Sequence, residues 1–177
     1  MEKRAHLGMA GLHAAMSEFL YRGYNASEPA VDIGDDAHVV DDQTGTMWRL
    51  QVKTADQSED GGATYLLSRG QLREVKENEL FYMFMVRRAQ GWRFILIGRT
   101  ELAEIRSSFE RADRAGKPGR RPATEEDART DALALKIEWS DDDARGWGSS
   151  FAAYLDCWPD KFPKNTSGPG AVTPARR

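Results

Sequence analysis

The chain has 177 residues, of which 40% are hydrophobic and 30% charged, and its formal net charge is −3. These values predict one soluble domain over residues 1–160, large enough to fold without a metal or disulfide. A single cysteine excludes an intramolecular disulfide and a multi-cysteine metal centre. No apolar run approaches the roughly 20 residues that span a bilayer, and no signal-type segment follows the charged residues 1–6. We therefore expect a cytoplasmic protein without a membrane partner.

Helices are expected where apolar residues recur at helical spacing or where a capping residue precedes such a run. Leu12, Met16 and Phe19 share one face of the first helix, which Gly23 ends. Ser68 and Gln71 have the spacing of a capping box, and Thr100 is placed as the N-cap of a later helix. The expected helices cover residues 7–22, 68–77, 100–111 and 150–158.

Strands are expected where apolar residues alternate with polar ones or form a short continuous run. Residues 80–87 are almost all apolar, as in a strand that is buried on both faces. Residues 42–45 form a turn that joins two strands into a hairpin. The expected strands cover residues 37–41, 47–54, 64–67, 80–87, 92–98 and 133–139. This order predicts an α/β (α+β) fold, with a mixed β-sheet flanked by helices.

Two segments of unusual composition are expected outside the core. Residues 111–130 predict an exposed basic loop, because residues 111–122 hold five basic side chains, one acid, two glycines and two prolines. Residues 161–177 are rich in proline, glycine, serine and threonine and predict a disordered tail. The basic loop either holds DNA phosphates or is simply solvated. Its candidate DNA-binding residues are Arg114, Lys117, Arg120 and Arg121.

Three polar residues of the hairpin are expected to converge at one point. Asp36 precedes the first strand of the hairpin, and Gln51 follows it by fifteen residues on the returning strand. Side chains two residues apart share a face of a strand, so Gln51 and Lys53 point one way and Val52 the other. Carboxylate and amide oxygens suit Mg²⁺ (or Mn²⁺), which also keeps waters and phosphate oxygens as ligands. With Lys53 available to neutralise developing charge, the pattern indicates phosphodiester hydrolysis.

A further acid is available on the first helix. Gly8, Gly11, Ala15 and Glu18 fall within one narrow wedge of that helix. Small residues in line permit a close approach of the helix backbone to the sheet. Glu18 stands at the end of this stripe, where it could reach the hairpin and complete the site.

The helix with Gly11 and Glu18, Asp36 before an apolar strand, and the run Gln51-Val52-Lys53-Thr54 resemble the PD-(D/E)XK nuclease superfamily. The likeness covers about residues 7–110 and is greatest to a bacterial branch with a Gln-x-Lys variant of the last motif. The resemblance implies a restriction-endonuclease-like core, Mg²⁺-dependent hydrolysis of DNA, and a homodimer or larger complex for specificity. It implies catalytic roles for Glu18, Asp36, Gln51 and Lys53, the first three as metal ligands.

Alternatives remain open at this point. Asp32 is the competing register for Asp36. Gln51 stands where the superfamily usually has glutamate, and this favours a second hypothesis: an inactive nuclease-fold module that binds nucleic acid or scaffolds a complex. A third hypothesis is an interaction domain without nucleic acid. His38 and Cys157 are expected to be packing residues.

Overall fold

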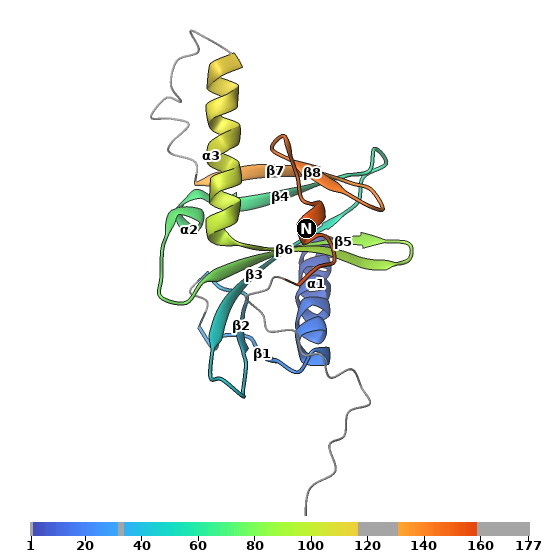
Figure 1. Ribbon diagram of the computed structural model, residues 1–177. Helices are drawn as coiled ribbons and strands as arrows, with labels where there is room; N and C mark the ends of the chain where they lie inside the picture. The colour runs from blue at the N-terminus through green and yellow to red at the C-terminus, as the bar shows by residue number, and fades with distance from the viewer. Residues whose placement is uncertain (1, 32–33, 117–130, 159–177) are drawn as a thin grey trace, which may run out of the picture.

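The computed structural model describes residues 2–31, 34–116 and 131–158 (Figure 1). Its helices are α1 (Glu2–Tyr21), α2 (Arg69–Arg73), α3 (Arg99–Gly116) and the short 3₁₀ helix η1 (Ala152–Tyr154). Its strands are β1 (Asn25–Ser27), β2 (Ala37–Val40), β3 (Met47–Asp56), β4 (Gly62–Ser68), β5 (Leu80–Arg88), β6 (Gly91–Gly98), β7 (Ala132–Trp139), β8 (Ala144–Gly146) and β9 (Ser149–Ser150).

The strands form two sheets. The first has the order β1-β2-β3-β5-β6, in which β3 and β5 are parallel and the other pairs antiparallel. The second has the order β4-β7-β8-β9 and is antiparallel throughout. The expected mixed sheet with flanking helices is therefore confirmed, whereas the division into two sheets was not predicted.

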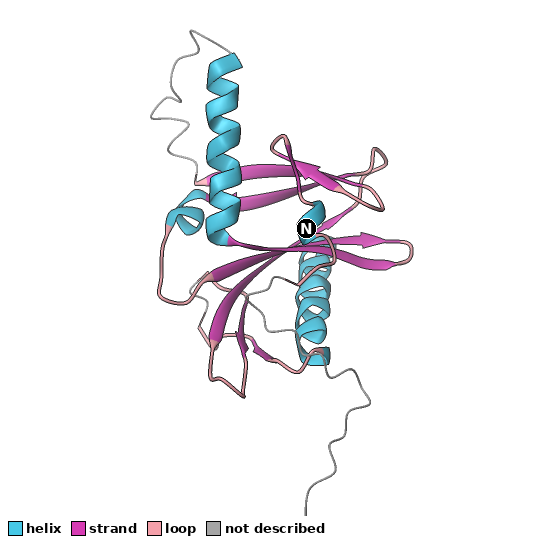
Figure 2. Ribbon diagram, in the orientation of Figure 1, coloured by secondary structure: helices cyan, strands magenta, loops and turns pink. Residues whose placement is uncertain are grey.

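The five-stranded sheet is covered on both faces, which explains the apolar run of β5. Phe81, Met83 and Met85 pack with α1 on one face. Tyr82 and Phe84 pack on the other face, against the second sheet and α3. Figure 2 shows α1 on one side of this sheet and α2, α3 and the second sheet on the opposite side.

Both ends of α3 differ from the prediction. Thr100 is not an N-cap but lies inside the helix, and its hydroxyl donates to Glu79. The helix continues to Gly116, so the first residues of the predicted loop are helical, because alanine and arginine at 111–115 are good helix formers. Arg114 belongs to this helix, and its side chain is not described. Lys117, Arg120, Arg121 and the predicted tail lie outside the described residues, as does Asp32.

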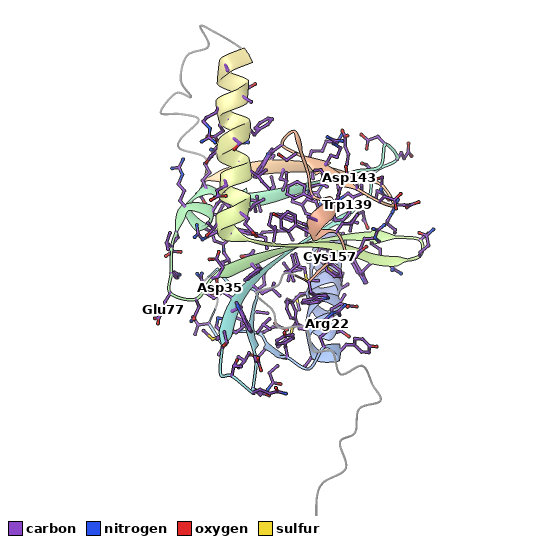
Figure 3. All side chains as sticks on the ribbon, viewed as in Figure 1. Arg22, Asp35, Glu77, Trp139, Asp143 and Cys157 are labelled. Atoms are coloured by element: carbon purple, nitrogen blue, oxygen red, sulfur yellow. The ribbon has the colours of Figure 1, made fainter. Side chains whose placement is uncertain are left out.

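The predicted helix over residues 150–158 is wrong. This region contains β9 and the single turn η1, after a two-residue turn from β8 in which Trp147 and Gly148 have positive φ angles of 48° and 72°. Such a turn matches the twist of two antiparallel strands. Cys157, expected to be a packing residue, is exposed. It is labelled in Figure 3 near Arg22, whose guanidinium lies 4.2 Å from the ring centre of Trp158.

One glycine of the predicted small-residue stripe makes the close approach of α1 to the sheet. A Cβ added at Gly11 would overlap the side chain of Thr54 on β3. Ala15 is fully buried in the same interface. Gly8, by contrast, is exposed, and a Cβ there would meet nothing within 4 Å. The small residues therefore permit a close helix–sheet contact over one turn, at Gly11 and Ala15, and not along the whole helix.

This difference gives a matched pair of variants. Gly11→Ala should lower the free energy of unfolding by about 1–3 kcal/mol, because the packed interface must shift to admit a methyl group. Gly8→Ala adds the same methyl group in open space and should raise it by up to about 1 kcal/mol through helix propensity. Urea denaturation of both variants measures the contrast. Equal effects on stability would show that Gly11 is not a contact point.

Candidate functional site

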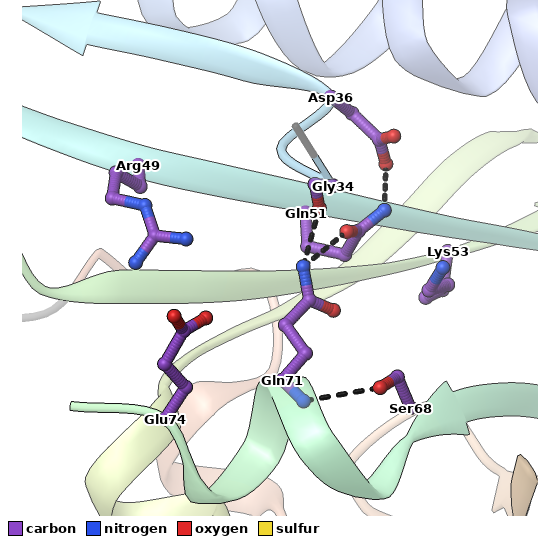
Figure 4. Close-up of a pocket in the computed structure, with 8 residues that line it drawn as sticks. All are labelled: Gly34, Asp36, Arg49, Gln51, Lys53, Ser68, Gln71 and Glu74. Atoms are coloured by element: carbon purple, nitrogen blue, oxygen red, sulfur yellow. Dashed lines mark hydrogen bonds between the residues drawn. The ribbon is translucent and has the colours of Figure 1, made fainter. Parts of the chain in front are cut away.

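A pocket of about 520 Å³ opens between β3, α2 and the segment before β2 (Figure 4). It lies on the face of the five-stranded sheet opposite α1, because Leu50 and Val52 of β3 pack into the α1 cluster. The pocket is polar and holds three of the four predicted catalytic residues. Its lining residues are Gly34, Asp36, Arg49, Gln51, Lys53, Ser68, Gln71 and Glu74.

Strict alternation along β3 places the polar side chains in the pocket. Val52 is 8% exposed, so its predicted burial is confirmed, and it packs against α1. Gln51 and Lys53 share the other face, but Gln51 is buried and only Lys53 is partly accessible. Arg49 is the third member of this face. A central strand with one polar face is unusual, since a sheet covered on both sides normally carries apolar residues on both.

The Asp36 carboxylate is held by β3. The backbone N–H of Asp36 donates to the carbonyl of Leu50 at 2.9 Å, which extends the β2–β3 pairing by one residue. One carboxylate oxygen accepts hydrogen bonds from the backbone N–H of Val52, at 2.7 Å, and from the side-chain amide of Gln51. The predicted convergence of Asp36 and Gln51 therefore exists as a direct hydrogen bond.

Gln71, on α2, links the other side of the pocket to Gln51. Its side-chain amide donates to the Gln51 side-chain oxygen at 2.8 Å and to the carbonyl of Gly34. Its own oxygen accepts from the Tyr82 hydroxyl at 3.2 Å. Burial raises the pKa of Tyr82, so this hydroxyl stays protonated and remains a donor. The side-chain amides of Gln51 and Gln71 thus tie together four segments: the one before β2, β3, α2 and β5.

Ser68 explains why Gln71 points into the pocket. Its hydroxyl accepts from the backbone N–H of Gln71 at 3.0 Å, so the predicted N-cap is confirmed. The second half of a capping box, a return of the Gln71 side chain to the backbone at Ser68, does not form; that side chain binds Gln51 and Gly34 instead. Helix α2 ends at Arg73, four residues earlier than predicted.

Lys53 is the unpaired cation of the pocket. Within the described part of the chain, its ammonium makes no hydrogen bond or ion pair, although Asp36 and Glu74 also line the cavity. A partly exposed lysine side chain on a sheet centre that lacks an anionic partner is available to an anionic ligand. Figure 4 shows Lys53 on the same side of β3 as the Gln51 amide.

Asp35 and Arg49 form a buried ion pair at the edge of the pocket. Two guanidinium nitrogens of Arg49 donate to the two carboxylate oxygens at 2.6 and 2.7 Å, and the Asp35 side chain is 1% exposed. The hydrogen bond to Asp35 raises the pKa of the Arg49 guanidinium further above its ordinary value, while burial opposes this. His38, 3.7 Å from the same carboxylate, packs against the pair, as a structural histidine would. The pair anchors the Gly34–Asp36 segment to β3.

Glu18 does not come to this pocket. It lies on α1, whose buried face covers the opposite side of the sheet, and its carboxylate pairs with Arg22 one helical turn away. Within the described residues, no side chain of α1 lines the cavity. The small-residue stripe correctly indicated a close helix–sheet approach, but that approach occurs on the face that the pocket does not use.

Several pocket residues were missed by sequence reasoning, and two signals point to them. Ser68, Gln71 and Glu74 are spaced by three residues, which places polar groups on one helical face. Arg49, Gln51 and Lys53 repeat at every second position of an otherwise apolar strand. Gly34 carries no such signal, because it contributes a backbone carbonyl.

The chain matches no protein-family model and no curated protein. Among solved structures, it is similar to a bacterial homing endonuclease, I-Ssp6803I, with 18% sequence identity and a TM-score of 0.41. The match covers 56% of this chain and 72% of that chain. A likeness of this size does not assign the chain to a family.

Two features are absent from the part of the chain that the structure describes. No cluster of three or more histidine, cysteine, aspartate or glutamate side chains is arranged to hold a metal ion there. No helix among these residues is long and apolar enough to cross a membrane. A cation in the pocket would draw on the carboxylates of Asp36 and Glu74, on amide oxygens, and on ligands from solvent or substrate.

Proposed function

We propose that this chain is a divalent-cation-dependent deoxyribonuclease and that the pocket around Asp36, Gln51 and Lys53 is its active site. The observation that carries the proposal is the meeting of these three side chains, from β3 and from the segment before β2, in one polar cavity. The motif order that resembles the PD-(D/E)XK superfamily supports DNA as the substrate class.

The donor set fits Mg²⁺. This ion typically binds one or two carboxylates and keeps several waters or phosphate oxygens, and here Asp36 offers a carboxylate beside the amide of Gln51. When bound, Mg²⁺ would lower the pKa of a water and stabilise developing negative charge. Asp36 and Gln51 would hold the ion, and Lys53 would hold a phosphate oxygen or orient the attacking water.

The present orientation of Gln51 adds a condition. Its amide nitrogen faces Asp36 and its oxygen accepts from Gln71. For Gln51 to ligate an ion shared with Asp36, its amide must turn so that oxygen and nitrogen exchange places. Gln71 must then turn as well, since two N–H groups would otherwise face each other. Cation binding at Gln51 is therefore coupled to the amide of Gln71.

Substitution of Gln51 tests its role as a ligand. Gln51→Glu should tighten Mg²⁺ binding roughly tenfold, because a charge added a few ångströms from the ion contributes on the order of 1–4 kcal/mol. Gln51→Leu should weaken binding by removing the oxygen. Isothermal titration measures both affinities. The matched control is Gln43→Glu, which adds the same charge in the exposed β2–β3 turn. Equal affinities at position 51 for all three residues would exclude a ligand role.

A cleavage assay tests the proposed function directly. Supercoiled and linear DNA are incubated with the purified full chain in Mg²⁺, in Mn²⁺ and in EDTA, and the products are separated by electrophoresis. Cleavage with either cation and none in EDTA is the expected result. Binding of DNA without cleavage under any of these conditions would instead support the second candidate, an inactive nuclease-fold module. Gln51, an uncharged residue beside a single carboxylate, is the observation that favours that alternative.

A further inference from the structure

A second and smaller cavity lies on the other side of α2. Its volume is about 90 Å³, and residues of α2, α3 and β7 line it. It is lined by three arginines and one glutamate among small and apolar residues: Arg69, Leu72, Arg73, Ala103, Arg106, Ser107, Glu110 and Leu133. We call this cavity, with its three arginines, the arginine groove.

The three arginines differ in how they are paired. Arg106 is fixed, because it donates to Glu110 at 2.9 Å and lies 5.0 Å from the ring centre of Trp147. Arg69 reaches the same Glu110 only at 4.0 Å, and its Nε is shielded from solvent with no hydrogen-bond partner among the described residues. Arg73 is exposed and makes no hydrogen bond or ion pair within the described part of the chain. Glu110 thus pairs closely with Arg106 and weakly with Arg69, and Arg73 has no carboxylate partner among the described residues.

The unmet donors define the ligand. The guanidinium groups of Arg69 and Arg73 are planar, and their N–H groups match the oxygens of a phosphate. At about 90 Å³, the cavity is much smaller than the pocket of about 520 Å³ and suits a single such group. The groove is therefore a site for one anionic group of a larger molecule.

The position of the groove relates it to the larger pocket. The two cavities lie on different sides of α2. Gln71 and the cap residues Ser68 and Glu74 line the pocket, whereas Arg69 and Arg73 line the groove. A helix with its side chains is about 10–12 Å across, so the two cavities lie about one helix width apart, within reach of neighbouring phosphates of one DNA molecule.

We propose that the arginine groove binds a backbone phosphate of DNA that flanks the bond cleaved in the pocket. This inference rests on the proposed nuclease function. It assigns substrate positioning to α2 and the adjacent face of α3. Because phosphate contacts carry no base information, the groove contributes affinity and register and not sequence preference.

The test is a salt titration of DNA binding by the full chain. Anisotropy of two fluorescein-labelled duplexes of unrelated sequence is measured in EDTA at several salt concentrations, and Mg²⁺-dependent cleavage of the same duplexes is measured in parallel. Each phosphate contact contributes about 0.9 to the slope of log affinity against log salt. Arg73→Gln should lower the slope on both duplexes, and Arg69→Gln with Arg73→Gln should lower it by about one unit in total, because the groove holds one phosphate.

Arg87→Gln is the matched control. Arg87 is an exposed arginine at the end of β5, in the hairpin that points away from α2 (Figure 1). Its loss changes net charge equally and should leave the slope unchanged. If wild type and Arg73→Gln have equal slopes and the protein cleaves DNA, the groove does not bind a phosphate. The proposed nuclease function would be unaffected by that result. An effect on only one duplex would also overturn a phosphate contact. No binding and no cleavage by the wild type would overturn the groove together with the proposed function.

Discussion

Lys53→Met is expected to reduce DNA cleavage by at least about 10²-fold, the usual loss when a charge-stabilising group is removed from an active site. The fold should be unaffected. Methionine keeps the apolar stem of lysine, and within the described residues the ammonium makes no hydrogen bond or ion pair that would be lost. Initial cleavage rates in Mg²⁺, together with thermal melting, measure the two properties separately.

Two further variants make the Lys53 result specific. Lys53→Arg keeps the charge and should retain part of the activity. Lys136→Met removes an exposed lysine of β7, in the second sheet, and should retain wild-type activity. Cleavage by Lys53→Met at the wild-type rate would remove Lys53 from the mechanism, whatever the behaviour of the controls.

The second large effect concerns stability. Asp35→Ala should lower the free energy of unfolding by about 3–5 kcal/mol, because it leaves the guanidinium of Arg49 buried without its partner. The carboxylate that is removed is 1% exposed and accepts two hydrogen bonds from Arg49. Chemical denaturation followed by circular dichroism gives the value.

A double variant separates the cost of the orphaned charge from other effects. Asp35→Ala combined with Arg49→Met removes both charges and should recover much of the lost stability, as replacement of buried pairs by apolar residues often does. Asp60→Ala, which breaks the exposed Asp60–Lys136 pair, should have a much smaller effect. If the double variant were no more stable than Asp35→Ala, the ion pair would not be the source of the loss.

Residues with a strong local pattern were predictable from the sequence. Asp36, Gln51 and Lys53 meet because a hairpin fixes register and a strand alternates its side chains, and both rules are local. The N-cap at Ser68 follows from the same kind of short-range signal. These rules placed the pocket on the correct strands.

Other features depend on contacts between distant segments. The bond from Gln71 to Gly34 joins residues 37 apart, and no local spacing encodes it. The assignment of Glu18 failed for a related reason: helical periodicity gives the face of α1 but not the side of the sheet on which α1 packs. Helix α3 extends past Arg111 into the predicted loop. The helix propensity of residues 111–115 outweighs the loop signal of the glycines and prolines beside them.

The neighbouring residues Asp35 and Asp36 bind two different residues of β3. The Asp35 carboxylate lies in the buried pair with Arg49, and the Asp36 carboxylate lies in the pocket beside Gln51. Loss or gain of one residue between Gly34 and Ala37 would shift both aspartates relative to β3 and break both contacts at once. In the evolutionary history of this protein, the segment is therefore free to change some side chains but not its length. Related sequences should show insertions in the exposed β2–β3 turn and none between positions 34 and 37.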